Sequence, residues 1–277
     1  MFECVVNISE GRNTSLLRDL STTTGQSLRD LHSDEFHNRS VFTLINTSDQ
    51  LVPDAHSLIA ASFERLDLRH HEGVHPRFGV VDVIPFVALD PRDGDGAVAL
   101  RDATAQWIGN DLGVPVFLYG PLMGPLGANI RTLPDVRRGA FTRFSPDFGP
   151  SQPSPTLGAC ALGARPLLIA WNLWLRGVAL DEARGIANIV RRADVRALAF
   201  SVGEHVQVSC NLIAPEEVGP QQVYDEVASL LHHGEIVRAE LVGLLPRSVL
   251  AKQDQERWAQ LGLSDDQTIE SRLAEAG

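Results

Sequence analysis

The chain has 277 residues, 44% of them hydrophobic, and a formal net charge of −11. This is enough for a substantial core in one large or two modest domains. The acidic charge repels phosphate backbones, so we expect no nucleic-acid partner. The sequence has no run of about 18 apolar residues, so we expect no membrane-spanning helix. The three cysteines, Cys4, Cys160 and Cys210, lie far apart, which is typical of a reducing, cytoplasmic compartment.

The first stretch of the chain is predicted to have the element order βαββαβ. Its N-terminus has no basic region and turns polar at once, so it predicts a strand and not a signal peptide. Ser9 and Asn13 are both suitable caps for the helix that follows. The predicted elements are a strand at Phe2–Ile8, a helix at Asn13–Thr24, strands at Gln26–His32 and Ser40–Asn46, a helix at Leu51–Leu66 and a strand at Phe78–Leu89.

The middle of the chain is predicted to be less regular. A helix is expected at Gly96–Leu112 and a short strand at Val114–Tyr119. The next segment, Gly120–Gly158, is dense in glycine and proline and predicts a long irregular region. Such long structureless segments in a compact protein are usually functional or disordered.

The order βαββαβ recurs after this region. Gly203 permits the tight turn between the two central strands. Because both stretches share one order of elements, we predict an α+β fold of two ferredoxin-like (βαββαβ) subdomains, divided between Gly158 and Pro166. The predicted elements are strands at Pro166–Leu175, Val195–Val202, Glu204–Ile213 and Ile236–Leu244, with helices at Asp181–Arg192 and Gln221–His233.

The densest group of chemically versatile side chains is the segment Arg69–Arg77. It holds three of the nine histidines and lies between a predicted helix and a predicted strand. Loops held by rigid elements often carry functional residues, and histidine exchanges protons near neutral pH. The segment is therefore a candidate catalytic loop, with a histidine-rich surface loop as the alternative.

Residues 71–75 also match the zinc-binding pattern H-E-x-x-H. That pattern requires a helix that places both imidazoles on one face, one turn apart. Gly73 weakens such a helix, and Pro76 pushes His75 toward an extended conformation. We therefore expect no metal site, and a zinc hydrolase remains a weaker alternative.

Two further segments carry polar groups suited to ligand binding. Asn38 can donate and accept, and Arg39 offers a fork that binds a carboxylate. A polar turn between strands is the alternative for both residues. In Asp147–Gly158, glycines allow close approach of the backbone and Phe148 could stack on a flat ring. Taken alone, this second segment is no better than a linker.

Taken together and in order, these segments resemble the glutamate formiminotransferase family (glutamate formimidoyltransferase) over nearly the whole chain. The H-x-G-x-H-P-R-x-G-x-x-D segment at 71–82 is the most specific of them. The matching segments are Glu3–Arg12, His37–Leu44, His71–Asp82, Val81–Phe86, Gly113–Tyr119, Pro146–Pro150, Gly163–Arg165, Gln207–Asn211 and Glu240–Leu244.

The resemblance implies an activity and a set of roles. The enzyme would move a formimino group from N-formimino-L-glutamate to N5 of the co-substrate tetrahydrofolate, as a cytoplasmic homodimer without an attached cyclodeaminase domain. Its subdomains would be residues 1–160 and 161–277, with the ligand cleft between them. His75 falls at the position of the catalytic general acid–base. Substrate binding would fall to Asn38, Arg39, Arg77 and Asp82, and folate binding to Phe148, Gly149, Pro150, Ser151 and Gly158.

The chain departs from the family pattern at some positions. Val74 stands where an acidic residue is common, and His32 where an aspartate is usual. These departures leave two further hypotheses open: a transferase for a related formimino or formyl donor, and a non-catalytic folate-binding paralogue. If His75 is the base, the rate should fall in acid near pH 6.5, the ordinary pKa of histidine, unless the environment moves it.

Overall fold

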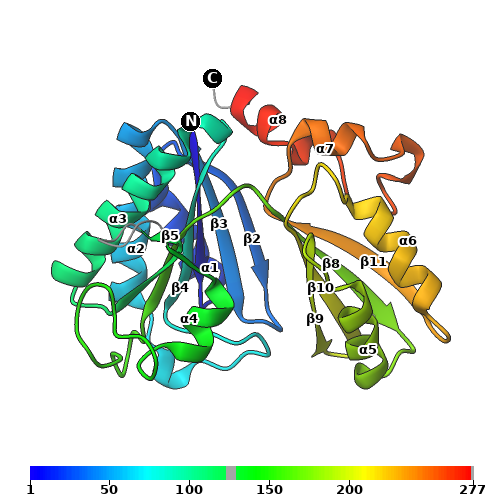
Figure 1. The fold of residues 1–277 in the computed structure, drawn as a ribbon, viewed down its shortest axis with the longest axis horizontal. Coiled ribbons are helices and arrows are strands. Elements are labelled where there is room, and N and C mark those ends of the chain that lie inside the picture. The colour runs from blue at the N-terminus through cyan, green and yellow to red at the C-terminus, as the bar shows by residue number, and fades with distance from the viewer. Residues whose placement is uncertain (123–128, 276–277) are drawn as a thin grey trace. The chain divides into compact units, whose positions relative to one another are not determined.

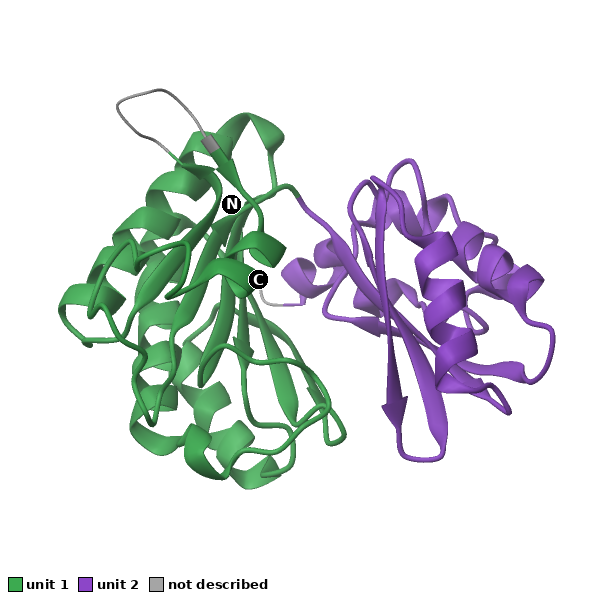
Figure 2. Cartoon of the chain, turned by 60° about the horizontal axis from the view of Figure 1, so that its bottom comes forward, with its two compact units in different colours: residues 1–166 green, residues 167–277 purple. Residues whose placement is uncertain are grey.

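The computed structural model describes residues 1–122 and 129–275, which form two compact units, Met1–Pro166 and Leu167–Gly277 (Figures 1 and 2). The part of the predicted irregular region at 123–128 lies outside the described residues. No helix in the described part of the chain has both the length and the apolar character needed to cross a bilayer.

The first unit confirms the predicted βαββαβ order and adds to it. The short strand β7 begins at Cys160, the last residue of the predicted first subdomain, and belongs to this unit. Its elements are β1 (Phe2–Ile8), α1 (Thr14–Ser21), β2 (Leu28–Asp34), β3 (Arg39–Asn46), α2 (Ser48–Arg65), β4 (Val81–Ala88), α3 (Gly94–Asn110), β5 (Val116–Leu122), β6 (Asn129–Arg131), α4 (Leu133–Gly139) and β7 (Cys160–Ala164), with short 3₁₀ turns at Thr22–Thr24, Leu68–His70 and Pro91–Asp93.

The sheet of this unit has the order β2-β3-β1-β4-β7-β5-β6. The first four strands pair antiparallel in the ferredoxin-like order. Strand β7 then joins β4 in parallel, and β5 joins β7 in parallel. The helix and strand pattern therefore predicted the four-strand core and the later strand β5 correctly, but it did not predict β6, β7 or their place in the sheet. Strand β7 was missed because its five residues are all buried and show no alternation of polar and apolar side chains.

The two faces of this sheet are covered differently. One face packs on α1, α2 and α3 through alternate strand residues such as Val6, Leu44 and Leu162, and Figure 1 shows α2 and α3 along it. The other face carries a smaller core, in which Phe117 on β5 packs against Val136 on α4. Because successive side chains of a strand point to opposite faces, α4 lies on the face that α1–α3 leave open.

Helix α4 corrects the prediction of an irregular region from Gly120 to Gly158. It begins with a capping box, in which Thr132 and Asp135 satisfy each other's backbone N–H groups. The following segment is held to β5, since the Val116 N–H donates to the Phe148 carbonyl at 3.0 Å. The signal T-x-x-D was present in the sequence, but a seven-residue helix is too short to show a clear helical period.

The second unit repeats the ferredoxin-like arrangement. Its sheet has the order β11-β8-β10-β9, and all pairs are antiparallel. Trp171 lies in the core beneath α5 and α6, and its indole N–H donates to the Leu261 carbonyl at 2.9 Å. The elements are β8 (Ile169–Arg176), α5 (Leu180–Val190), β9 (Val195–Val202), β10 (His205–Leu212), α6 (Pro220–Leu230), β11 (Glu235–Val242), α7 (Arg247–Ala251) and α8 (Ile269–Ala274), with 3₁₀ turns at Gln255–Arg257 and Asp265–Gln267.

Candidate functional site

Two loops of the first unit are bound to each other and form the base of the candidate site. Asn38 adopts a left-handed conformation, with φ of 46°, which asparagine tolerates better than most residues. Its side-chain amide donates to the Glu72 carbonyl at 2.9 Å and accepts from the Gly11 N–H at 2.9 Å. His71 Nε2 donates to the Asn38 carbonyl at 2.8 Å. Asn38 is thus buried and engaged at both ends of its amide, and its role in substrate binding stays a prediction.

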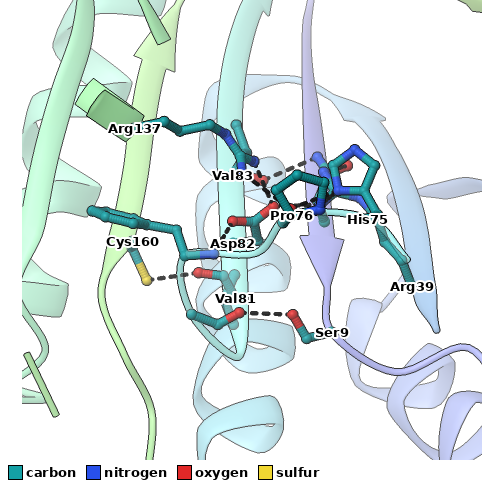
Figure 3. Close-up of polar contacts among 12 residues, drawn as sticks. Ser9, Arg39, His75, Pro76, Val81, Asp82, Val83, Arg137 and Cys160 are labelled. Carbon is teal, nitrogen blue, oxygen red and sulfur yellow. Dashed lines mark hydrogen bonds and ion pairs between the residues drawn. The ribbon is translucent and has the colours of Figure 1, made fainter. Parts of the chain in front are cut away.

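Asp82 is the fully buried centre of the site. It lies on β4, and one carboxylate oxygen accepts from the Phe78 N–H at 2.7 Å. The other accepts from Arg39 Nη1 and, at 2.8 Å, from Arg137 Nη2. Burial by itself would raise the pKa of Asp82, but the guanidiniums of Arg39 and Arg137 hold that pKa below its ordinary value. Asp82 is therefore an anion shared by two cations, as Figure 3 shows.

Arg39 is oriented from its other side by Asn7. Arg39 Nη2 donates to Asn7 Oδ1 at 2.8 Å. The Asn7 amide in turn donates to the carbonyls of Val5 and Val83, both at 3.0 Å. These two bonds fix which end of the Asn7 amide faces Arg39. Arg39 is thus held between the first, third and fourth strands of the sheet, and its side chain stays 17% exposed.

His75 lies beside Arg39 and Asp82 and is half-buried. Its Nδ1 lies 2.6 Å from the Pro76 carbonyl oxygen and 3.3 Å from Arg39 Nη1. A carbonyl oxygen only accepts, so the shorter contact requires a proton on Nδ1. That tautomer places the lone pair of the ring on Nε2. Burial, and then the charge of Arg39, lower the pKa of His75 to about 3, so the imidazole is neutral at pH 7.

Arg77 is engaged within the histidine loop. Its Nη2 donates to the His71 carbonyl at 2.5 Å, and its Nη1 lies 3.4 Å from the Gly73 carbonyl. Residues 71–80 form no helix, so His71 and His75 do not meet the geometric requirement of the zinc pattern. The part of the chain that the structure describes has no group of three or more histidine, cysteine or acidic side chains arranged to hold a metal.

The predicted folate segment is only partly joined to this site. Phe148 packs against the core on the face of α1–α3, while Pro150 and Ser151 are exposed. Gly149 has a φ of 82°, and a Cβ there would lie 2.6 Å from the Val114 carbonyl oxygen. Gly158, by contrast, forms a bridge with Gly79 at the base of the histidine loop. The structure thus brings Gly158 near the loop and accounts for Phe148 and Gly149 by packing.

Sequence reasoning missed two members of the site, Asn7 and Arg137. Asn7 lies in one of the segments that carry the resemblance. Its position in a strand does not indicate that its amide contacts Arg39, which lies 32 residues further along the chain. Arg137 comes from α4, and its guanidinium meets Asp82 over a separation of 55 residues. No local pattern signals such a contact, because it depends on how α4 docks on the sheet.

Comparison with known proteins identifies the family. Residues 1–165 match the N-terminal subdomain of the formiminotransferase domain. The chain belongs to the formiminotransferase family. It is 34% identical to the glutamate formimidoyltransferase of Thermoplasma acidophilum over 90% of this chain and 89% of the relative. It is 31% identical to the glutamate formimidoyltransferase of Streptococcus pyogenes serotype M1 over 90% of each chain.

The formiminotransferase family also includes longer relatives. The chain is 32% identical to the formimidoyltransferase-cyclodeaminase of Sus scrofa over 90% of its own length, but spans only 51% of that relative. The chicken protein of the same name is likewise 32% identical and is covered over 51%. The chain thus spans about half the length of these relatives and about nine tenths of the microbial formimidoyltransferases.

Proposed function

We propose that this formiminotransferase family member moves a formimino group from N-formimino-L-glutamate to N5 of tetrahydrofolate, with His75 as its general acid–base. The observation that carries the proposal is the contact between His75 Nδ1 and the Pro76 carbonyl at 2.6 Å, because it leaves a basic nitrogen on the other side of a neutral ring. The relatives named glutamate formimidoyltransferase, which match over nine tenths of both chains, support the choice of reaction.

The chemistry needs one proton to move between two nitrogens. N5 of tetrahydrofolate attacks the amidine carbon of the donor and forms a C–N bond. His75 Nε2 takes the proton that N5 then loses. The same proton passes to the glutamate nitrogen, the bond from that nitrogen to carbon breaks, and glutamate leaves. General acid–base catalysis of this kind is typically worth about 10²–10⁴-fold, and alignment of the two substrates adds to it.

The charges of the cluster suit an anionic donor. Arg39 and Arg137 bring two positive charges to the single negative charge of Asp82, so the cluster is left with an excess positive charge. Both arginine side chains are partly exposed, at 17% and 24%. We assign Arg39 to a carboxylate of the donor, with Asp82 behind it. Asn38 and Arg77 were predicted to bind the substrate, but both donate to backbone carbonyls of the histidine loop, so we assign them to shaping that loop around the donor.

The remaining parts of the proposal follow the family resemblance. The exposed Pro150 and Ser151 and the segment from Phe148 to Gly158 are assigned to the folate. We further propose that the enzyme is a cytoplasmic homodimer and that the transfer needs no metal. Size-exclusion chromatography with light scattering tests the dimer, and an assay after exhaustive chelation tests the metal. Loss of activity that only zinc restores would contradict the transferase mechanism.

The decisive experiment measures transfer and binding separately. Purified protein is assayed for formation of 5-formiminotetrahydrofolate from N-formimino-L-glutamate, and in parallel from N-formyl-L-glutamate. Folate affinity is measured by titration without a donor. Transfer from the formimino donor alone supports the proposal. Transfer only from the formyl donor would replace the substrate. Tight folate binding without any transfer would favour a non-catalytic folate-binding protein, the hypothesis that Val74 leaves open.

A further inference from the structure

Arg137 links the buried carboxylate of the site to the peptide that holds His75. Its Nη2 donates to Asp82 at 2.8 Å, and its Nη1 donates to the Pro76 carbonyl at 3.0 Å. The same carbonyl accepts from His75 Nδ1 at 2.6 Å. A carbonyl oxygen has two lone pairs, and here one faces the arginine and the other the imidazole. Figure 3 shows Arg137 extending from its helix toward Asp82 and Pro76.

Helix α4 holds Arg137 in a defined position. The helix begins at the capping box of Thr132 and Asp135, and Val136 is completely buried against the open face of the sheet. Just before the helix, Arg131 pairs with Asp147 at 2.7 Å. A side chain on an anchored helix that is bound through both terminal nitrogens, Nη1 and Nη2, loses little further conformational freedom during the reaction.

We propose that Arg137 is a positioning residue for His75: by bridging Asp82 and the Pro76 carbonyl, it fixes the imidazole in the tautomer whose Nε2 accepts a proton. The consequence for group transfer rests on the proposed function, whereas the tautomer itself does not. Without the bridge, the Pro76 carbonyl is free to turn, and Nδ1 of His75 can accept from Arg39 Nη1, 3.3 Å away. The proton then moves to Nε2 and the base is lost.

The substitutions Arg137→Lys and Arg137→Gln separate the bridge from the charge. Lysine keeps the positive charge but has one nitrogen, which cannot copy the planar fork that reaches both acceptors. Glutamine removes the charge as well. The matched control is Arg138→Gln, because Arg138 is the next residue of α4, is 67% exposed and pairs with Asp135 within the same helix. All variants are first checked by circular dichroism and thermal unfolding to be folded at the temperature of the measurements.

The test of the tautomer uses long-range ¹H–¹⁵N correlation spectra of the imidazoles in substrate-free protein at pH 7. We expect the parent and Arg138→Gln to show His75 protonated at Nδ1. We expect Arg137→Lys and Arg137→Gln to show a mixture of tautomers. If both Arg137 variants keep the pure Nδ1–H form, the proposal is overturned. A tautomer change in a protein without transfer activity would uphold the positioning role and refute only the proposed function.

Kinetics give the second readout. We expect Arg137→Lys to lower kcat roughly 10- to 100-fold, as expected for a misplaced catalytic group, with KM for the donor nearly unchanged. Arg137→Gln should also move the acid limb of kcat/KM to higher pH, because the charge of Arg137 helps to lower the pKa of His75. A raised KM with unchanged kcat in both variants would instead make Arg137 a donor-binding residue and overturn the proposal.

Discussion

The two units share one strand order but place their charged residues differently. In the first unit, the core order β2-β3-β1-β4 continues into β7, β5 and β6, and α4 packs on the face that α1–α3 leave open. In the second unit, β11 ends the sheet. Asp82 on β4 is completely buried between two arginines, whereas Glu235 on β11 pairs with Arg176 while both are at least 60% exposed. The same strand order thus carries a buried charged site in the first unit and an exposed ion pair in the second. The difference lies in the strands β7, β5 and β6 and the helix α4, which the first unit adds.

The largest expected effect is on catalysis by the first unit. Replacing His75 by Gln or Ala should lower turnover about 10²–10⁴-fold, because the proton carrier is lost. Folate affinity should change little, since the lost interaction belongs to the transition state. Steady-state transfer and a separate folate titration measure the two quantities. Replacing His70, which is exposed, serves as the matched control, and near-parental turnover of the His75 variant would refute the assignment.

The next effect compares the buried centres of the two units. Asp82→Ala leaves Arg39 and Arg137 without their shared anion, and should destabilise the first unit by about 3–5 kcal/mol. Trp171→Ala opens a cavity in the core of the second unit and should cost a similar 3–5 kcal/mol there. Hydrogen exchange followed by mass spectrometry locates each loss. If Asp82→Ala speeds hydrogen exchange in β8–β11 as much as in β1–β4, the two units do not unfold independently.

The third effect is the dependence of the stability of the first unit on acid. Burial lowers the pKa of His56, stacked on Trp107 at 3.8 Å, to about 4, and that of His75 is lowered to about 3. Below pH 6.5 the unfolded chain therefore binds more protons than the folded one, and stability falls as pH falls toward 4. We expect the first unit to lose roughly 1–2 kcal/mol between pH 6.5 and 5, after allowance for partial exposure.

Urea unfolding followed by Trp107 fluorescence, in a variant with the other tryptophans replaced by phenylalanine, measures this loss. His56→Gln should remove part of the slope without changing the activity. The depressed pKa of Asp82 acts in a lower window, since its contribution is complete above about pH 3.9 and is lost only as pH falls further. A stability that is flat between pH 6.5 and 5 would contradict the histidine assignment.

The same pKa of His75 changes the expected pH dependence of catalysis. The neutral imidazole is the active base, so activity is lost as pH falls through its pKa. The ordinary value for histidine places that limb near pH 6.5, but the lowered pKa places it well below for kcat/KM. In the complex, donor carboxylates offset the charge of Arg39, so the limb for kcat should lie at higher pH. Coincident limbs at pH 6.5 would contradict this.

The smallest effect concerns the exposed pair of the second unit. Arg176→Gln removes the ion pair with Glu235, whose side chains are 63% and 60% exposed. Exposed pairs contribute about 0–1 kcal/mol, so the melting temperature should shift only slightly and not at all in high salt. Thermal unfolding at low and high salt measures it. A loss as large as that from Asp82→Ala would overturn the contrast between the two sheets.

The sequence predicted the repeated elements because each depends mainly on local residues. Alternation in β1 and β10, the Asn13 cap of α1 and the turn at Gly203 are all short-range signals. The same signals failed for α4, which has seven residues within Gly120–Gly158, and for β7, which has five residues just after that segment. Short elements are stabilised by what they pack against, so their own residues do not specify them.

The same distinction between local and long-range signals applies to the site. The sequence by itself determined the two ferredoxin-like units, the family resemblance and His75 as the candidate base, since these rest on patterns within single segments. Only the tertiary structure decided that Asp82 is fully buried and that Arg137 reaches it from α4. It also decided that His75 Nδ1 lies 2.6 Å from the Pro76 carbonyl oxygen, the contact from which we infer the tautomer. Burial, charge pairing and tautomer depend on atoms brought together from distant parts of the chain, and no local pattern encodes those distances.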